Sequence, residues 1–185
     1  ILLIITTSFQ ANITFAVPAM NVYTNNTSDP MGYMDWARAS APITVTPSNT
    51  ATAGVCLPTA GAEEFGDMYF FNLFDSHADS LSGNYYDPEV AAEIAKIADK
   101  RTVRMVDHYT ALTPVNDGFE VGMTYANYNI NVYTKNPQRY IQELAEYQAA
   151  ANENGFEDVT LGAFEINSGD YTCLLYTSPS PRDAT

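Results

Sequence analysis

The chain contains the stretch MNVYTNN at residues 20–26 and repeats it as INVYTKN at residues 130–136. The similarity continues further along the chain at one constant spacing: Thr52, Gly54 and Gly61 match Thr160, Gly162 and Gly169. A period of roughly 110 residues exceeds the 20–50 residues of a solenoid unit, so the repeat indicates a duplicated half-domain.

The first copy is expected to contain four strands and two helices. The strands are expected at residues 19–24, 51–57, 67–75 and 102–112. Asp29-Pro30 and Asp87-Pro88 are typical helix starts, so helices are expected from Pro30 to about residue 40 and from Pro88 to about residue 101. Residues 41–49 contain two prolines and are expected to form a loop. This order predicts an α+β fold, βαββαβ, with an antiparallel sheet and both helices on one face.

The second copy repeats only the first part of this order. A strand is expected at residues 128–134, a helix from Asn136-Pro137 to about residue 152, and a strand at residues 158–166. The predicted organisation is therefore a first half at 17–115, a linker at 116–127 and an incomplete second half at 128–172.

Two ferredoxin-like βαββαβ units in tandem resemble the dimeric α/β-barrel superfamily. Its members include antibiotic-biosynthesis monooxygenases, stress-responsive barrel proteins and haem-handling barrels. The resemblance covers residues 19–172 at the level of element order and repeat, and no catalytic motif of the family is matched. It implies a truncated barrel whose two sheets face each other, with helices on the outer faces and a ligand pocket between the halves.

The two ends of the chain are expected to lie outside this domain. Residues 1–16 open with the apolar run ILLII and end in Thr14-Phe15-Ala16, which is typical of a truncated secretory signal; a buried strand is the alternative. Residues 173–185 resemble a translated sequencing adapter, an artefact without biological content. We therefore expect a secreted or periplasmic protein, with Cys56 as its one native cysteine and no disulfide.

The charge of the chain argues against several classes of function. It has 22 acidic and 8 basic residues and a formal net charge of -14, which disfavours binding to nucleic-acid phosphates or to anionic membrane surfaces. A small ligand is therefore expected to be neutral or cationic. No metal-ligand spacing, glycine-rich phosphate loop or nucleophile elbow occurs, so no metal site is predicted.

The strand expected at 102–112 carries the candidate catalytic residues. Strict alternation places Arg104, Val106 and His108 on one face, so Arg104 and His108 are expected to point into the same space. In that arrangement His108 would accept a proton and Arg104 would stabilise an oxyanion. The alternative is that acidic neighbours bind both side chains.

Four further residues are candidate ligand-binding residues: Tyr23, Tyr133, Tyr69 and His77. Tyr23 and Tyr133 occupy equivalent places in the two copies, as a pocket with pseudo-twofold symmetry requires, although repeated core tyrosines give the same pattern. His77 follows the strand at 67–75 and is expected at a pocket rim. The sequence Asp75-Ser76-His77 is not a catalytic triad, because consecutive residues cannot align their side chains in one relay.

These features together predict an exported protein that binds a small apolar or phenolic molecule between its halves, without a cofactor. One alternative is an enzyme, either a cofactor-free monooxygenase-like barrel or a haem-binding barrel that uses His108 or His77. Another is a non-catalytic structural or interaction module. No nucleic-acid or membrane partner is expected for the mature chain, whereas self-association through the exposed sheet of the incomplete half is expected.

Overall fold

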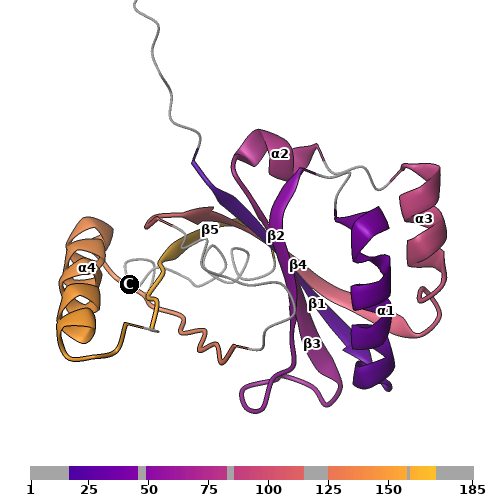
Figure 1. Cartoon of the computed structure of the whole chain (residues 1–185), viewed down its shortest axis with the longest axis horizontal. Coiled ribbons are helices and arrows are strands. Elements are labelled where there is room, and N and C mark those ends of the chain that lie inside the picture. The colour runs from indigo at the N-terminus through magenta and orange to yellow at the C-terminus, as the bar shows by residue number, and fades with distance from the viewer. Residues whose placement is uncertain (1–16, 46–48, 83–85, 115–124, 158, 170–185) are drawn as a thin grey trace, which may run out of the picture.

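The computed structural model describes residues 17–45, 49–82, 86–114, 125–157 and 159–169. The predicted signal segment at 1–16, most of the predicted linker, and the predicted artefact at 173–185 lie outside these ranges. The described residues form one five-stranded antiparallel sheet with four helices (Figure 1), so the fold is α+β. None of the helices described is long and apolar enough to cross a membrane.

The first part of the chain follows the predicted order with one addition. Its elements are β1 (Ala19–Thr27), α1 (Pro30–Thr44), β2 (Thr50–Cys56), β3 (Asp67–Phe74), α2 (His77–Leu81), α3 (Pro88–Ala95) and β4 (Arg101–Ala111). The sheet order is β2-β3-β1-β4-β5, with β1 between β3 and β4 and every neighbouring pair antiparallel. Without α2 and β5, this is the ferredoxin-like arrangement.

Capping side chains begin the helices where the sequence indicated. The Asp29 carboxylate accepts a hydrogen bond from the Gly32 N–H at 2.9 Å, and Asp87 accepts from the Glu89 N–H at 2.9 Å. The Ser76 hydroxyl accepts from the Asp79 N–H at 3.1 Å and begins α2, a five-residue helix that was not predicted.

The ends of the helices differ from the prediction. Helix α1 continues through Pro42 to Thr44, so the expectation of a loop from residue 41 is wrong; the Val45 N–H still reaches the Ala41 carbonyl at 2.9 Å and closes the last turn. Helix α3 ends at Ala95 rather than near residue 101. After Ala95 the backbone hydrogen bonds join residues three apart instead of four. The first of them runs from the Lys96 N–H to the Glu93 carbonyl.

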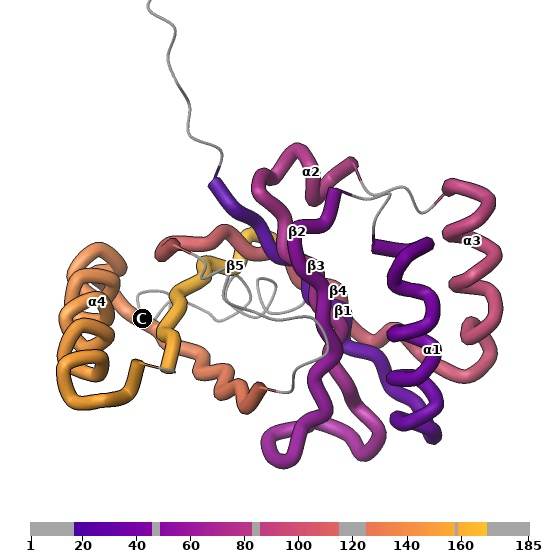
Figure 2. Tube along the Cα trace, in the orientation of Figure 1, coloured from indigo at the N-terminus to yellow at the C-terminus, as the bar shows by residue number. Residues whose placement is uncertain are grey.

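The main core lies between the sheet and the helices. Helices α1 and α3 lie side by side against one face of the sheet (Figures 1 and 2). Tyr33, Met68 and Ile97 form the buried cluster, with Met34, Trp36 and Val55 packed around it. We call this side of the sheet, to which Met68, Asn72, Asn21 and His108 belong by register, the helix face.

The second copy does not form a second sheet. Residues 125–134 have no regular secondary structure, so the strand predicted at 128–134 is wrong. A strand requires backbone hydrogen bonds to a neighbouring strand, and none of the described strands pairs with this segment. The tandem barrel is therefore not observed.

The last two elements follow this irregular segment. Helix α4 (Pro137–Glu153) begins at the predicted cap, where Asn136 Oδ1 accepts from the Arg139 N–H at 3.1 Å, but none of its residues is buried. It stands apart from the sheet in Figure 1. Strand β5 (Phe164–Ser168) starts later than the expected residue 158 and pairs with β4, at the edge of the first half's own sheet.

Candidate functional site

A row of polar side chains crosses the centre of the helix face. Asn72 of β3, Asn21 of β1 and His108 of β4 are direct cross-strand partners. Asn21 and Asn72 are 2% and 9% exposed, and His108 is half-buried. Burying polar groups in the middle of a sheet costs free energy unless they are hydrogen-bonded, so such a row indicates a candidate site. We call these three residues the polar row.

Asn21 sets the orientation of His108. The Asn21 side-chain amide donates to the backbone carbonyl of Ser80 in α2 at 3.2 Å, so its Oδ1 faces His108. The His108 Nδ1–H donates to this Oδ1 across 2.7 Å. In the neutral ring the proton therefore lies on Nδ1, and Nε2 carries the lone pair. His108 can accept a proton through Nε2.

Asn72 supplies a second acceptor. Its Oδ1 is buried and has no hydrogen-bond partner among the described residues. Leaving such a group unsatisfied costs about 1–3 kcal/mol, so native proteins rarely retain one without a reason. Since β3 and β4 are separated only by β1, the strands carrying the two acceptors are about 10 Å apart. This span suits a small molecule with more than one hydrogen-bond donor.

Helix α2 covers one end of the helix face and is fastened to it at two points. One is the bond from Asn21 to the Ser80 carbonyl. At the other, His77 Nε2 lies 2.9 Å from the hydroxyl oxygen of Thr110, which also accepts from the Asn167 amide of β5 at 2.6 Å. His77 therefore lies on the same side of the sheet as His108.

Arg104 lies on the opposite face, so the expectation that Arg104 and His108 point into the same space is wrong. The register between β1 and β4 shifts between Thr24 and Asn25, and the β-bulge places Arg104 as an extra residue on β4. An extra residue reverses the alternation of side chains beyond it. Arg104 Nη1 contacts the Asp67 carboxylate at 2.5 Å, and Nη2 lies 3.2 Å from a carboxylate oxygen of both Glu63 and Glu64. Arg104 is therefore bound by acidic neighbours, which is the alternative expected from the sequence.

Asp67 is the buried centre of this second cluster, with a fully covered side chain. Burial alone would raise its pKa, but hydrogen bonds from Asn26, Arg104 and the Glu64 N–H, together with the Arg104 charge, lower the pKa below its ordinary 3.8. The charged carboxylate thus ties the segment before β3 to β1 and β4. This is a structural role.

The three tyrosines are not brought together. Tyr23 packs against Phe70 on the helix face, with ring centres 6.1 Å apart. Tyr69 lies on the opposite face, where burial and then the charges of Asp67 and Glu63 raise its pKa. Tyr133 is 79% exposed in the irregular segment, so it does not occupy a position equivalent to that of Tyr23.

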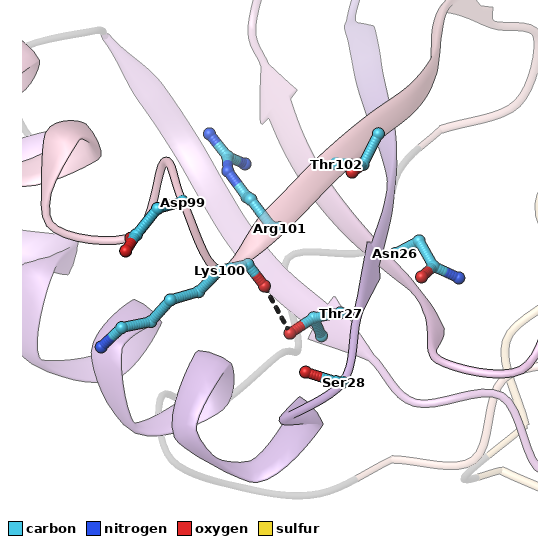
Figure 3. A pocket seen from close by; sticks show the side chains of 7 residues that line it. All are labelled: Asn26, Thr27, Ser28, Asp99, Lys100, Arg101 and Thr102. Atoms are coloured by element: carbon cyan, nitrogen blue, oxygen red, sulfur yellow. Dashed lines mark hydrogen bonds between the residues drawn. The ribbon is translucent and has the colours of Figure 1, made fainter.

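A hollow of about 200 Å³ lies at the other end of β1 and β4. It is lined by Asn26, Thr27, Ser28, Asp99, Lys100, Arg101 and Thr102 (Figure 3). The Thr27 hydroxyl is bound to the Lys100 carbonyl at 2.9 Å, and Arg101 is bound to Asn25 and Tyr33 on the helix face. The side chains of Asn26, Thr27 and Arg101 are thus engaged within the fold, and we do not take the hollow as the site. No group of three or more potential metal ligands occurs in the described part of the chain.

Sequence reasoning missed Asn21 and Asn72. A signal was present for each: Asn72 is the one polar residue in the apolar stretch MYFFNLF at 68–74, and Asn21 belongs to the repeated heptapeptide. A polar residue inside an apolar strand requires a hydrogen-bonding explanation. Their alignment in one row could not be predicted, because the cross-strand neighbours are unknown before the register is known.

Comparisons with known proteins add little to this description. No family model and no curated protein matches the chain. Among solved structures, the chain is similar to a Chloroflexus aurantiacus J-10-fl protein described as an antibiotic biosynthesis monooxygenase, with 14% identity and a TM-score of 0.37. The similarity covers 56% of this chain and 99% of that one. A likeness of this size says nothing about activity.

Proposed function

We propose that this chain is a small-molecule-binding protein that holds a neutral, hydroxyl-bearing ligand at the polar row. The observation that carries the proposal is the buried Oδ1 of Asn72, which has no hydrogen-bond partner among the described residues and lies in the same row as His108, whose Nε2 lone pair is set by Asn21. Both atoms are acceptors, so the ligand must offer two hydrogen-bond donors, as a diphenol does. The net charge of -14 disfavours an anionic ligand.

The chemistry open to these residues is removal of a proton from the ligand. His108 Nε2 would accept the proton, and the resulting imidazolium would keep its Nδ1–H bond to Asn21 Oδ1. Asn21 acts as a positioning residue, because it holds the ring through Nδ1 and leaves Nε2 for the ligand. A cofactor-free, monooxygenase-like reaction on a phenol would begin with this deprotonation.

The surroundings of His108 do not fit a haem. Its neighbours by register are Asn21 and Ser168 on the adjacent strands and Val106 and Thr110 along β4, and Asn72 lies one strand beyond Asn21. The other histidine, His77, has its Nε2 engaged with Thr110. A porphyrin occupies a wide, mostly apolar slot, and this row is polar.

The proposal can be tested with 4-nitrocatechol, which carries two hydroxyl donors and whose phenolate absorbs visible light. At a pH where the free compound is protonated, adding the protein should produce a saturable rise in phenolate absorption. Asn72→Leu and His108→Gln should each weaken binding about tenfold, the effect of losing one hydrogen bond worth about 1.4 kcal/mol. Only His108→Gln should also abolish the phenolate signal.

Ser28→Ala, in the hollow at the other end of β1, provides the control and should bind like the native chain. Absence of saturable binding to the native chain would overturn the proposal. Equal binding to all four proteins would overturn it as well, because the ligand would then lie elsewhere.

A further inference from the structure

Helix α1 holds a second buried polar atom that the fold does not use. The indole Nε1 of Trp36 is buried and has no hydrogen-bond partner among the described residues. Trp36 packs against the buried cluster of the core, and its ring lies 5.4 Å from the Tyr33 ring, centre to centre. An indole N–H can only donate, and a buried one usually finds an acceptor. Trp36 is therefore a candidate donor to a bound molecule.

Trp36 and Asn72 lie on the same side of the sheet. Met68, Phe70 and Asn72 alternate along β3 on the helix face, so Met68 and Asn72 are about 13 Å apart along the strand. Trp36 packs against the cluster that contains Met68, and half-buried Phe70 lies between Met68 and Asn72. A molecule that extends from Asn72 over Phe70 therefore approaches the indole N–H.

The length of this path limits the size of the molecule. A hydrogen bond of about 2.8 Å at each end leaves roughly 7 Å of the 13 Å path for the molecule itself. This is roughly the span of one benzene ring with an oxygen substituent at each end.

We propose that the Trp36 Nε1–H donates a hydrogen bond to a carbonyl oxygen of the ligand held at the polar row. The inference rests on the proposed function and names the class of ligand, a dihydroxyphenyl ketone or aldehyde. Its hydroxyl groups face Asn72 and His108, its ring packs on Phe70, and its carbonyl oxygen faces Trp36.

The chemistry of the donor and the charge of the chain favour a carbonyl group. The indole N–H requires an acceptor at this end of the ligand, whereas Asn72 Oδ1 and His108 Nε2 require donors at the other end. A carboxylate would also accept, but the net charge of -14 disfavours an anion. A carbonyl oxygen accepts a hydrogen bond without carrying a charge.

The indole signal of the native chain tests the proposal directly. Trp36 is the one tryptophan of the chain, so its Nε1–H gives a single indole signal in a ¹H–¹⁵N correlation spectrum. 3,4-Dihydroxyacetophenone should move this signal to higher ¹H frequency as the hydrogen bond forms. 4-Ethylcatechol has a methylene group in place of the carbonyl, so it should bind through the same hydroxyl groups and move the signal much less.

Binding affinities of the same two compounds provide a second test. Trp36→Phe should lower the ratio of the affinity for 3,4-dihydroxyacetophenone to that for 4-ethylcatechol about tenfold, the effect of losing one hydrogen bond. The ratio cancels a general effect of the substitution on the site. Tyr69→Phe is the matched control, because it removes an aromatic donor on the opposite face of the sheet and should leave the ratio unchanged.

The outcomes separate this inference from the proposed function. An indole signal that responds equally to both compounds, or a ratio that Trp36→Phe leaves unchanged, would overturn the role of Trp36 and leave the polar row as the site. If 4-ethylcatechol does not bind the native chain, or binds Asn72→Leu equally well, the proposed function is wrong and the role of Trp36 is wrong with it. If Trp36→Phe does not fold, the indole signal of the native chain decides.

Discussion

Asn21 and Asn72 are direct cross-strand partners in one row, yet replacing each with leucine should change stability in opposite directions. Leucine has nearly the shape of asparagine and no polar atoms. Asn72 Oδ1 has no partner within the described structure, so Asn72→Leu removes an unsatisfied buried acceptor. Asn21 holds the Ser80 carbonyl and the His108 Nδ1–H, so Asn21→Leu leaves two groups without their partner.

The magnitudes follow from these contacts. Removing the unsatisfied Asn72 Oδ1 should recover about 1–3 kcal/mol of folding free energy. Packing the methyl groups of the leucine costs part of this gain, so we expect Asn72→Leu to stabilise the chain by about 1 kcal/mol. Asn21→Leu leaves the Ser80 carbonyl and the His108 Nδ1–H without their partner. It should destabilise the chain by about 2 kcal/mol, because His108 is half-buried and its Nδ1–H can still reach water. The two variants should therefore differ by about 3 kcal/mol, or roughly 6–12 °C in melting temperature.

Urea unfolding followed by circular dichroism measures the difference. The slope of unfolding free energy against urea should be the same for both variants and the native chain, because neither change alters the surface exposed on unfolding. Equal destabilisation by the two leucines would show that the two asparagines do not differ in hydrogen bonding. It would show that Asn72 Oδ1 has a partner in the folded protein and is not reserved for a ligand.

Three further outcomes test the rest of the fold. The pKa of Asp67 is lower in the folded chain than the ordinary 3.8, so the stability that its carboxylate contributes is complete above pH 3.8 and is lost as the pH falls through the folded pKa. On acidification, the free energy of unfolding measured in urea should therefore fall less steeply for Asp67→Asn than for the native chain. Met68→Ala empties a fully buried position and should cost about 2–4 kcal/mol by the same assay. Gly66→Ala should lower the melting temperature more than Gly61→Ala, because both have positive φ but only at Gly66 would a Cβ meet a backbone oxygen, at 2.4 Å.

Local signals predicted much of the fold. The pairs Asp29-Pro30, Asp87-Pro88 and Asn136-Pro137 begin helices because an acceptor side chain and a proline satisfy the first turn without tertiary help. The four strands of the first half follow from alternation and from turn residues. Their antiparallel order then follows from the short connections and the two helices.

Features that depend on neighbours could not be predicted in the same way. Residues 128–134 have the pattern of β1, but a strand forms only by pairing with another strand, and no described strand pairs with these residues. The bulge at Arg104 is a property of the β1 and β4 pair, so alternation along β4 alone assigned Arg104 to the wrong face. Likewise, the polar row exists only once three strands are in register.

Asn21 fixes the tautomer of His108, so that Nε2 is available as a proton acceptor. A long-range ¹H–¹⁵N correlation spectrum of the imidazole rings, recorded where His108 is neutral, measures this directly. Asn21→Leu, with His108→Gln for assignment, serves as the reference. We expect protonated Nδ1 and unprotonated Nε2 in the native chain, and loss of this preference in Asn21→Leu. A native His108 with its proton on Nε2 would show that Asn21 does not set the tautomer.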